Sequence, residues 1–431
     1  LHNVAHSFPT RRSSDLGNGN FIWSKMMNNR GSVNVDYSDN IIISGYFIGT
    51  TDMNPNFGIY NMTPTGNSDG YIIKLDSQGN FVYAKQIGGI NTFIDNTYLT
   101  EIDKQNNIYL SGLFGGTIDF NPNGGVNNLT SSLISVSDSY ILKLDSNCNF
   151  IWVKQITNSY FGEITNLKID SNFNIYYSIM FQIGTIDLDP SPNNFLLTSL
   201  GSYDFAISKM DNNGTFVWGK HFGGNGIETA YSMELDQNDD ILLCGAIGFD
   251  SVDLDPGLGV VIFNPIGLYD GYLLKLNSNG NYIYSKQFGG DSTSNFIPYS
   301  VIVDNNNLLL CGTFGGKVDF DPNTSVNYQL ANAQDGFILK LSEFPLSLNT
   351  RNESNLQVYP NPVVKFLTLD NLENEVYKIM VFNSIGELIH QVSDLKVNKV
   401  DIDFSRLGRG EYFIKIYSKK QITDAIKVII L

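Results

Sequence analysis

The chain has 431 residues, of which 42% are apolar, 13% aromatic and only 16% charged, and its formal net charge is −16. This apolar content is sufficient for a substantial core, which excludes a disordered chain, and the acidic balance argues against a nucleic-acid partner or an anionic membrane surface. No apolar run approaches the roughly 20 residues of a membrane-spanning helix, so we expect no membrane insertion.

Residues 1–16 stand apart from the rest of the chain. They contain SFPTRRSSDL (Ser7 to Leu16), which resembles the translation of a sequencing adapter rather than of a gene. We expect residues 1–16 to be non-native and exclude them from the prediction of the fold.

A block of about 66 residues recurs between residues 17 and 341. Its clearest marker is the Asp that opens the segment DGYIIKLD, which returns at separations of 69, 66, 66 and 65 residues as Asp69, Asp138, Asp204, Asp270 and Asp335. A Lys follows five residues after each of them, at Lys74, Lys143, Lys209, Lys275 and Lys340. A fixed period of this size indicates that one supersecondary unit is repeated along the chain.

Each repeat contains four short segments that are rich in Ile, Val, Tyr, Phe and Trp. The first ends in Asp, the second has the form NIYLSG, the third is DGYIIKLD, and the fourth has the form NFVYAKQIG. Such segments, bounded by Asn, Asp, Ser and Gly, are typical of strands. Four antiparallel strands per repeat favour a propeller blade, because so small a sheet must stack on copies of itself to bury both faces.

The repeats predict an all-β fold, a five-bladed β-propeller over residues 17–341. A fourth-strand segment at Phe21 precedes the first full repeat, and the last repeat ends with a third strand at Phe337, so we predict that the N-terminal strand completes the last blade. The region also resembles bacterial β-propeller repeat proteins with GG…D…G signatures, as in FGGNGIETAYSMELDQNDDILLCG. That resemblance implies a propeller but no particular activity.

The connections between strands predict where ligands bind. The fourth-to-first and second-to-third connections are long and should emerge on one face, whereas the others are tight turns; binding residues favour long loops on a rigid scaffold. Each second-to-third connection carries an Asp-x-Asp/Asn-Pro step, whose acidic members after the first repeat are Asp119, Asp187, Asp189, Asp253, Asp255, Asp319 and Asp321. Paired oxygens at i and i+2 suit Ca²⁺, but Asp or Asn before Pro also starts turns by bonding its own backbone. Both interpretations stay open, with calcium as the candidate cofactor.

The residues that depart from the repeat are the candidates for catalysis. A polysaccharide hydrolase or lyase would need two carboxyl groups in different environments. The candidates are Glu101 and Glu234 on first strands, Glu163 and Glu228 near the long loops, and His221. We expect each to be solvated or to bridge blades, and we expect the chain not to be an enzyme.

The cysteines do not form a disulfide framework. Cys244 and Cys311 occupy the position of Ser44, Ser111 and Ser178 in other repeats, and Cys148 replaces a turn Gly. We predict that Cys244 and Cys311 are small buried residues at a tight packing point and that all three cysteines have a structural role.

After Leu341 the repeat stops. Residues 342–355 read as a polar linker, and residues 356–431 alternate apolar and polar residues in about seven short segments, which predicts a small β-sandwich. The leading YPNP, the central VFNSIGELI and the later GEYFIKI resemble the type A sorting domain of type IX secretion cargo, through Tyr359, Pro360, Asn361, Pro362, Gly386, Gly410 and Tyr412. The resemblance implies the type IX secretion machinery as partner and a secreted or outer-membrane-surface location.

These observations predict a secreted or surface-displayed β-propeller that binds an extracellular glycan or protein through its long-loop face. A polysaccharide-active hydrolase or lyase is the alternative, and a structural spacer without a ligand is a third possibility.

Overall fold

The computed structural model describes residues 22–27, 31–89, 96–133, 137–304, 307–323, 326–342, 357–360, 362–370, 376–383, 388–393, 399–418 and 426–430. The prediction of an all-β chain is confirmed for these residues, which form strands and no helix. The chain divides into two compact units, Leu1–Leu341 and Ser342–Leu431.

The first unit consists of five consecutive sheets. The first four contain the predicted strands in their predicted order: β1 (Gly31–Val35), β2 (Ile41–Phe47), β5 (Asp69–Leu75) and β6 (Phe81–Ile87); β7 (Asn96–Ile102), β8 (Ile108–Phe114), β11 (Asp138–Leu144) and β12 (Phe150–Asn158); β13 (Phe161–Ile169), β14 (Ile175–Gln182), β17 (Asp204–Met210) and β18 (Phe216–Phe222); β19 (Ile227–Leu235), β20 (Ile241–Gly248), β23 (Asp270–Leu276) and β24 (Tyr282–Gly290). The fifth sheet has β25 (Asn295–Asp304), β26 (Asn307–Asp319) and β27 (Tyr328–Ser342), and the end of β24 pairs with β26, which joins the fourth and fifth sheets.

Two of the cysteines lie at equivalent positions of the fourth and fifth sheets. Cys244 on β20 is buried, as predicted, and its thiol lies 3.6 Å from the backbone oxygen of Pro298 in the fifth sheet. Cys311 on β26 is exposed, contrary to the prediction, and the described residues include no sheet that follows the fifth in this array.

The second-to-third connections contain short hairpins that the strand prediction missed. They are β3 (Thr51–Asp52) with β4 (Asn61–Met62), β9 (Thr117–Asp119) with β10 (Asn128–Thr130), β15 (Thr185–Asp187) with β16 (Leu196–Thr198), and β21 (Val252–Asp253) with β22 (Ile262–Phe263). Strands of two or three residues are too short to show alternation, so the sequence pattern alone did not reveal them.

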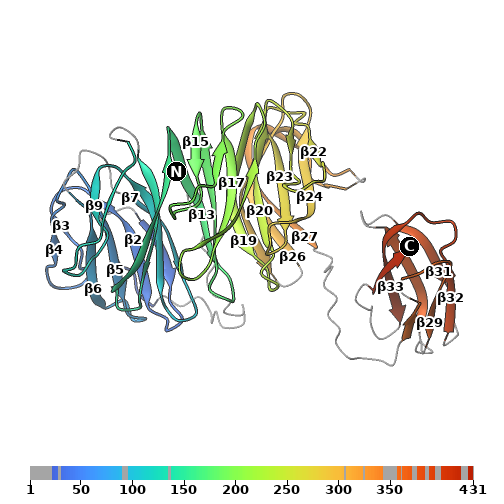
Figure 1. Cartoon of the computed structure of the whole chain (residues 1–431), viewed down its shortest axis with the longest axis horizontal. Coiled ribbons are helices and arrows are strands. Elements are labelled where there is room, and N and C mark those ends of the chain that lie inside the picture. Colours follow the sequence, from blue (N-terminus) through green and yellow to red (C-terminus); the bar gives the residue numbers. More distant parts are fainter. Residues whose placement is uncertain are drawn as a thin grey trace. The chain divides into compact units, whose positions relative to one another are not determined.

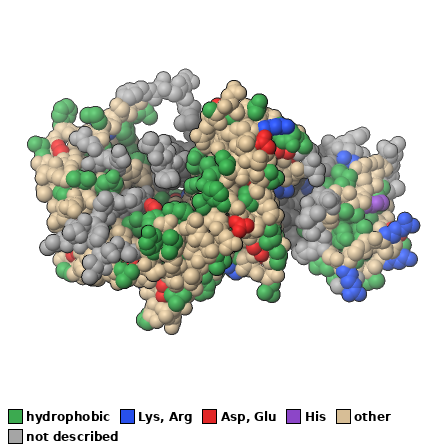
Figure 2. Space-filling view, turned by 90° about the horizontal axis from the view of Figure 1, so that it is seen from above, with side chains coloured by type: hydrophobic (Ala, Val, Ile, Leu, Met, Phe, Trp, Pro, Cys, Tyr) green, Lys and Arg blue, Asp and Glu red, His purple; other side chains and the backbone are tan. Residues whose placement is uncertain are grey.

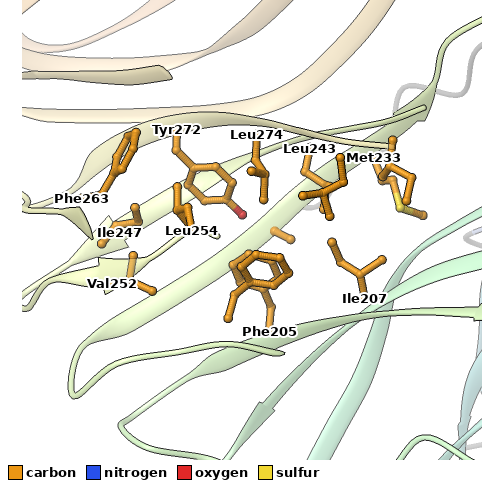
Figure 3. Packing of buried hydrophobic residues seen from close by; sticks show 14 of the residues in the cluster. Phe205, Ile207, Met233, Leu243, Ile247, Val252, Leu254, Phe263, Tyr272 and Leu274 are labelled. Atoms are coloured by element: carbon orange, nitrogen blue, oxygen red, sulfur yellow. The ribbon is translucent and has the colours of Figure 1, made fainter. Parts of the chain in front are cut away.

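The core lies between successive sheets. Figure 3 shows the layer shared by the third and fourth sheets, in which Phe205 and Ile207 of β17 face Leu243 of β20 and Tyr272 of β23. The rings of Phe205 and Tyr272 stack with their centroids 5.9 Å apart. The other interfaces repeat this arrangement, because the apolar side chains of each sheet form one buried cluster with those of the next sheet.

The repeated Lys and Asp stabilise single sheets and their junctions. Lys74 on β5 pairs with Asp36 after β1 at 2.9 Å, and Lys275 pairs with Asp236 in the same way at 2.8 Å. The ammonium group of Lys74 also donates to the backbone oxygen of Ser146 in the second sheet, at 3.4 Å. Lys74 therefore satisfies a buried carboxylate in its own sheet while it contacts the turn of the next sheet.

The described strands do not establish the predicted closed ring of five blades. In Figure 1 the sheets follow one another from blue to orange, with β3, β5 and β6 at one end of the first unit and β24 and β27 toward the other. Residues 22–27 form no strand, so the prediction that an N-terminal strand completes the last sheet is wrong for these residues; Phe21 lies outside the described residues. Instead, Trp23 lies against Gly79 and Met27 packs on the core of the first sheet.

The second unit has seven described strands in two sheets. β28 (Gln357–Tyr359), β29 (Phe366–Asp370) and β32 (Lys399–Asp403) form one sheet; β31 (Leu388–Ser393), β30 (Val376–Asn383), β33 (Gly410–Ser418) and β34 (Ile426–Ile430) form the other. Leu367 and Ile402 of the first sheet share a buried cluster with Ile379, Ile414 and Val428 of the second. The unit is thus a small β-sandwich with its own core.

Candidate functional site

The Asp-x-Asp/Asn-Pro steps form the turns of the hairpins. In β15–β16, one carboxylate oxygen of Asp187 accepts hydrogen bonds from the backbone N–H of Asp189 at 3.1 Å and of Phe195 at 2.8 Å. The same pair of bonds, to the residues two and eight positions later, forms at Asp52, Asp119, Asp253 and Asp319. Asp189, Asp255 and Asp321 each accept a further backbone N–H two residues on. Turn formation therefore accounts for the repeated acidic residues.

The residue between the two acidic positions is a core residue. Met53, Phe120, Leu188 and Leu254 are at most 1% exposed and Phe320 is 7% exposed. The middle side chain points into the core and the two flanking acidic side chains point outward, and this arrangement explains the two-residue spacing of the acidic positions without a metal ion. Within the described part of the chain, no group of three or more His, Cys, Asp or Glu side chains could hold a metal ion, and the calcium site stays a prediction.

The hairpins fold back over the fourth strands of their own sheets. The Tyr60 hydroxyl donates to the backbone oxygen of Ala84 on β6 at 3.2 Å, and the ring of Phe195 lies 4.9 Å from that of Phe216 on β18. β15 also pairs with the end of β12 in the preceding sheet. The long connections are therefore partly rigid straps between sheets rather than open loops.

The hairpin tips expose apolar side chains at one repeated position. Ile59, Val126, Val260 and Val326 hold it, with exposures of 79%, 74%, 72% and 59%, and Asn194 replaces them in the third hairpin. Two positions earlier, Phe57 and Leu258 are fully exposed. On the face of the first unit that Figure 2 shows, hydrophobic side chains gather in several separate groups among few charged ones. Single exposed apolar residues are ordinary on protein surfaces, but these recur at one position of successive repeats, so the hairpin tips are a candidate binding surface.

Two of the candidate catalytic carboxylates meet on the first strands. Lys168 on β13 lies 3.0 Å from a carboxylate oxygen of Glu101 on β7 and 3.3 Å from one of Glu234 on β19. Burial raises the pKa of Glu101. Burial also acts to lower the pKa of Lys168, but the attraction of the two carboxylates is the larger effect and raises the pKa of Lys168 above its usual value. The cavity beside them is about 20 Å³, which is room for about one water molecule but not for a sugar.

Lys168 is the member of this group that the sequence prediction missed. It occupies the same repeat position as Glu101 and Glu234, two residues before the Asp that ends the first-strand segment. The sequence did contain a signal for this bridge: the charge changes sign at one position from repeat to repeat. Because equivalent residues of adjacent repeats lie side by side, opposite charges at that position are expected to pair.

A second group lies where the third sheet leads into the fourth. Glu228 on β19 is fully buried; one of its carboxyl oxygens accepts the N–H of Gly224 at 3.0 Å and the other has no hydrogen-bond partner. Burial raises its pKa to about 7, and the nearby charges of Asp204 and Asp250 act in the same direction. The remaining predicted candidates do not join it as a catalytic set: His221 bonds Asp204 at 2.7 Å, and Glu163 lies on β13.

In the second unit, the predicted sorting residues lie in and beside the two sheets. Tyr359 ends β28 and its hydroxyl donates to Asp370 at 3.0 Å, while Lys399 reaches Asp370 at 3.5 Å. Gly410 has a φ of +151°, which side-chain-bearing residues rarely adopt.

The other predicted sorting residues that the structure describes lie close to Tyr359 or close to Gly410 in the chain. The Tyr412 hydroxyl donates to the backbone oxygen of Gly408 at 3.0 Å. Pro360 and Pro362 are exposed, and Asn361 and Gly386 lie outside the described residues. The described sorting residues thus lie in two places: exposed prolines after β28, and the start of β33, where the Tyr412 hydroxyl bonds back to Gly408.

Comparison with known proteins identifies the second unit. Residues 357–431 match the model of the secretion system C-terminal sorting domain. An uncharacterized WD repeat-containing protein of Acanthamoeba polyphaga mimivirus is 25% identical over 187 residues, which are 41% of this chain and 13% of that protein. The chain thus spans only a small part of that relative.

Solved structures give weaker similarity. The extracellular domains of two hybrid two-component systems from B. thetaiotaomicron are each 11% identical, with TM-scores of 0.22 and 0.12. The alignments cover 94% and 93% of this chain and 56% and 67% of those chains, and the scores are too low to support an argument.

The described residues include no helix of the length and apolar character that a membrane span requires. The sorting domain marks the chain as a protein that is secreted or attached to the outer cell surface through type IX secretion.

Proposed function

We propose that the first unit is a non-enzymatic, propeller-like binding module that the sorting domain delivers to the cell exterior, where it recognises an extracellular protein or glycan. The observation that carries this proposal is a set of exposed aliphatic side chains at one position of the second-to-third connections: Ile59, Val126 and Val260 in three hairpins, and Val326 between β26 and β27. Their backbones are fixed by the Asp-centred turns, so binding would require little ordering of the contact residues.

The chemistry of this surface favours a protein ligand over a glycan. These four Val or Ile side chains and the tip residue Leu258 offer apolar contact without hydrogen bonds, whereas sugars are usually bound by aromatic rings combined with polar groups. The exposed aromatic residues nearest to this pattern are Phe57 and Tyr60 in the first hairpin and Tyr328 at the start of β27, with exposures of 107%, 43% and 52%. An apolar patch on an extracellular partner is therefore our preferred ligand.

The alternative, a polysaccharide hydrolase or lyase, has less support. Glu101 and Glu234 do come together, with carboxylate oxygens no more than roughly 6 Å apart, a separation in the range that glycosidases use. However, Lys168 pairs with both carboxylates, and the space beside them does not admit a sugar ring. A general acid and a nucleophile also need different environments, which this symmetric bridge does not provide.

The proposal is tested by binding with the full chain. The variant Ile59→Ser/Val126→Ser/Val260→Ser/Val326→Ser should lose at least about tenfold in affinity for extracellular proteins that the unchanged chain retains on a column. The matched control replaces Val82, Ile151 and Val217 with Ser, because these side chains are 43–51% exposed on fourth strands outside the hairpins. Retention that survives the hairpin variant, or cleavage of a polysaccharide that Glu101→Gln abolishes, would refute the proposal.

A further inference from the structure

The junction between the second and third sheets differs from its neighbours at the repeated Lys. In the third sheet, Lys209 donates to the backbone oxygen of Ser278 in the turn of the fourth sheet at 3.2 Å, and the first sheet makes the same contact with the second. In the second sheet the Lys is Lys143, and the residue that it meets in the turn between β17 and β18 is Asn212. The equivalent turn residue is Ser in the first, second and fourth sheets. This junction therefore brings a side-chain amide to the amine.

Lys143 holds both oxygens of Asn212. Its ammonium nitrogen, at the end of a side chain from β11, donates to the side-chain oxygen of Asn212 and to the backbone oxygen of the same residue, the latter at 3.4 Å. The indole N–H of Trp152 on β12 donates to that backbone oxygen as well, at 3.2 Å. Three hydrogen bonds thus hold Asn212 against the second sheet with its amide group beside the amine.

The amine is buried next to aromatic rings. Lys143 is 5% exposed, and its nitrogen lies 4.9 Å from the centre of the Tyr109 ring, which packs edge-on against the ring of Trp152. Burial lowers the pKa of Lys143, although the charge of Asp103 acts in the opposite direction. A larger fraction of this amine is therefore neutral and nucleophilic than in an exposed lysine.

The Tyr109 hydroxyl lies beside the side-chain oxygen of Asn212. Tyr109 is fully buried, and its hydroxyl oxygen is 3.4 Å from that oxygen and 3.1 Å from a carboxylate oxygen of Asp103. A hydrogen-bond donor at a carbonyl oxygen stabilises the negative charge that forms when a nucleophile attacks the carbonyl carbon. Tyr176 holds the same place in the third sheet, but the turn residue that its hydroxyl contacts is Ser278.

We propose that Lys143 and Asn212 form an intramolecular isopeptide bond, with Tyr109 as the catalytic residue. The amine, after its proton has passed to solvent, attacks the side-chain carbonyl carbon of Asn212, and the Tyr109 hydroxyl donates to the carbonyl oxygen. When the tetrahedral intermediate collapses, the bond between this carbon and the amide nitrogen breaks. The amide nitrogen leaves as ammonia with the proton that the attacking nitrogen releases. An amine and a primary amide thus become a secondary amide and ammonia, and the second sheet is joined covalently to the third.

A second contact between Lys and Asn provides a comparison within the chain. Lys85 donates to the side-chain oxygen of Asn123 at 2.5 Å, but Lys85 is only half-buried. The amide nitrogen of Asn123 donates to the backbone oxygen of Cys148 at 2.9 Å and to the side-chain oxygen of Asn149 at 3.0 Å. These two hydrogen bonds hold the nitrogen that would have to leave, so we expect no bond to form between Lys85 and Asn123.

Mass spectrometry of the purified full chain tests the proposal. The intact mass should be lower than the mass of the sequence by one ammonia molecule, and a tryptic digest should contain a branched peptide that joins Lys143 to Asn212. Asn212→Ser introduces the turn residue of the other sheets and should abolish both signals. Tyr109→Phe keeps the ring and removes the hydroxyl, so the cross-linked fraction, followed over time after synthesis, should rise at least about tenfold more slowly.

Asn213→Ser is the matched control because it changes the next residue of the same turn. It also removes an Asn–Gly step, at which ammonia can be lost through a cyclic imide, and it should keep the branched peptide. Asn123→Ser should keep the branched peptide as well. A mass equal to that of the sequence would overturn the proposal. Loss of ammonia without a branched peptide would overturn it too, because the ammonia would then come from an imide rather than from the isopeptide bond.

Discussion

Lys168 joins Glu101 across two neighbouring sheets, with 3.0 Å between the ammonium nitrogen and a carboxylate oxygen, and it reaches Glu234 in the next sheet at 3.3 Å. Lys168 thus links the first strands of three successive sheets, β7, β13 and β19. Side-chain exposures of 13 to 18% place the group where water screens its charges weakly.

Replacement of Lys168 by Met should destabilise the first unit by about 3 kcal/mol, because two carboxylates would remain buried side by side without a cation. The free energy of unfolding is measured in urea at pH 7. The control Lys104→Met removes an exposed Lys from the turn after β7 and should change stability by less than about 0.5 kcal/mol. Adding Glu101→Gln and Glu234→Gln to the Lys168 variant should recover part of the loss; no recovery would show that the carboxylates are not the cause.

Replacement of Asp253 by Ala should destabilise the first unit by about 1–2 kcal/mol, because the N–H groups of Asp255 and Val261 lose their acceptor. If the hairpins are only turns, millimolar Ca²⁺ should leave the melting temperature of the full chain unchanged. Leu254→Ala, which empties a fully buried position, should cost more, about 3 kcal/mol. A calcium-dependent rise in melting temperature that Asp253→Ala abolishes would instead establish the calcium site.

The period of the sequence was sufficient to predict the four main strands of each of the first four sheets and their order. Asp69 and its equivalents begin third strands in four sheets, and the alternation in residues 356–431 predicted a second, separate β unit. These features depend on local residue patterns, which repeat with the structure.

Closure was not predictable in the same way. The balance of strand types favoured a ring, but whether a ring closes depends on the small rotation between successive sheets, which no residue of the repeat encodes alone. The hairpins were missed because their strands are so short. The Lys168 bridge requires side-by-side packing of three repeats, and the burial of Glu228 depends on a loop conformation that its glycine-rich sequence does not specify.

Deletion of residues 342–431 should prevent export while the first unit stays folded, because the two units have separate buried cores. The deletion variant should be found inside a host with a type IX secretion system, and the full chain outside its outer membrane or in the medium. Circular dichroism and urea unfolding of the purified deletion variant check that the first unit folds. A folded variant that still leaves the host would contradict the role of the sorting domain.

Glu228 should make the stability of the first unit depend on pH. Its pKa is about 7 in the folded chain, above the ordinary value of 4.5, so the folded state binds the proton more tightly than the unfolded state does. The stabilisation is complete below about pH 4.5 and is lost as pH rises through 7, by about 3 kcal/mol in total. Glu228→Gln keeps a neutral side chain, so its free energy of unfolding should fall less than that of the unchanged chain between pH 5 and pH 8.

Asp250→Asn is the matched control for this measurement. Hydrogen bonds from Ser251 and Asn225 lower the pKa of Asp250, so its contribution has the opposite sign and is lost only as pH falls through that lowered pKa. Because the charge of Asp250 is only a minor cause of the raised pKa of Glu228, the Asp250 variant should keep most of the decline in stability between pH 5 and pH 8. Equal slopes for the unchanged chain and Glu228→Gln in that range would contradict the prediction, because they would show that the buried carboxyl group does not titrate there.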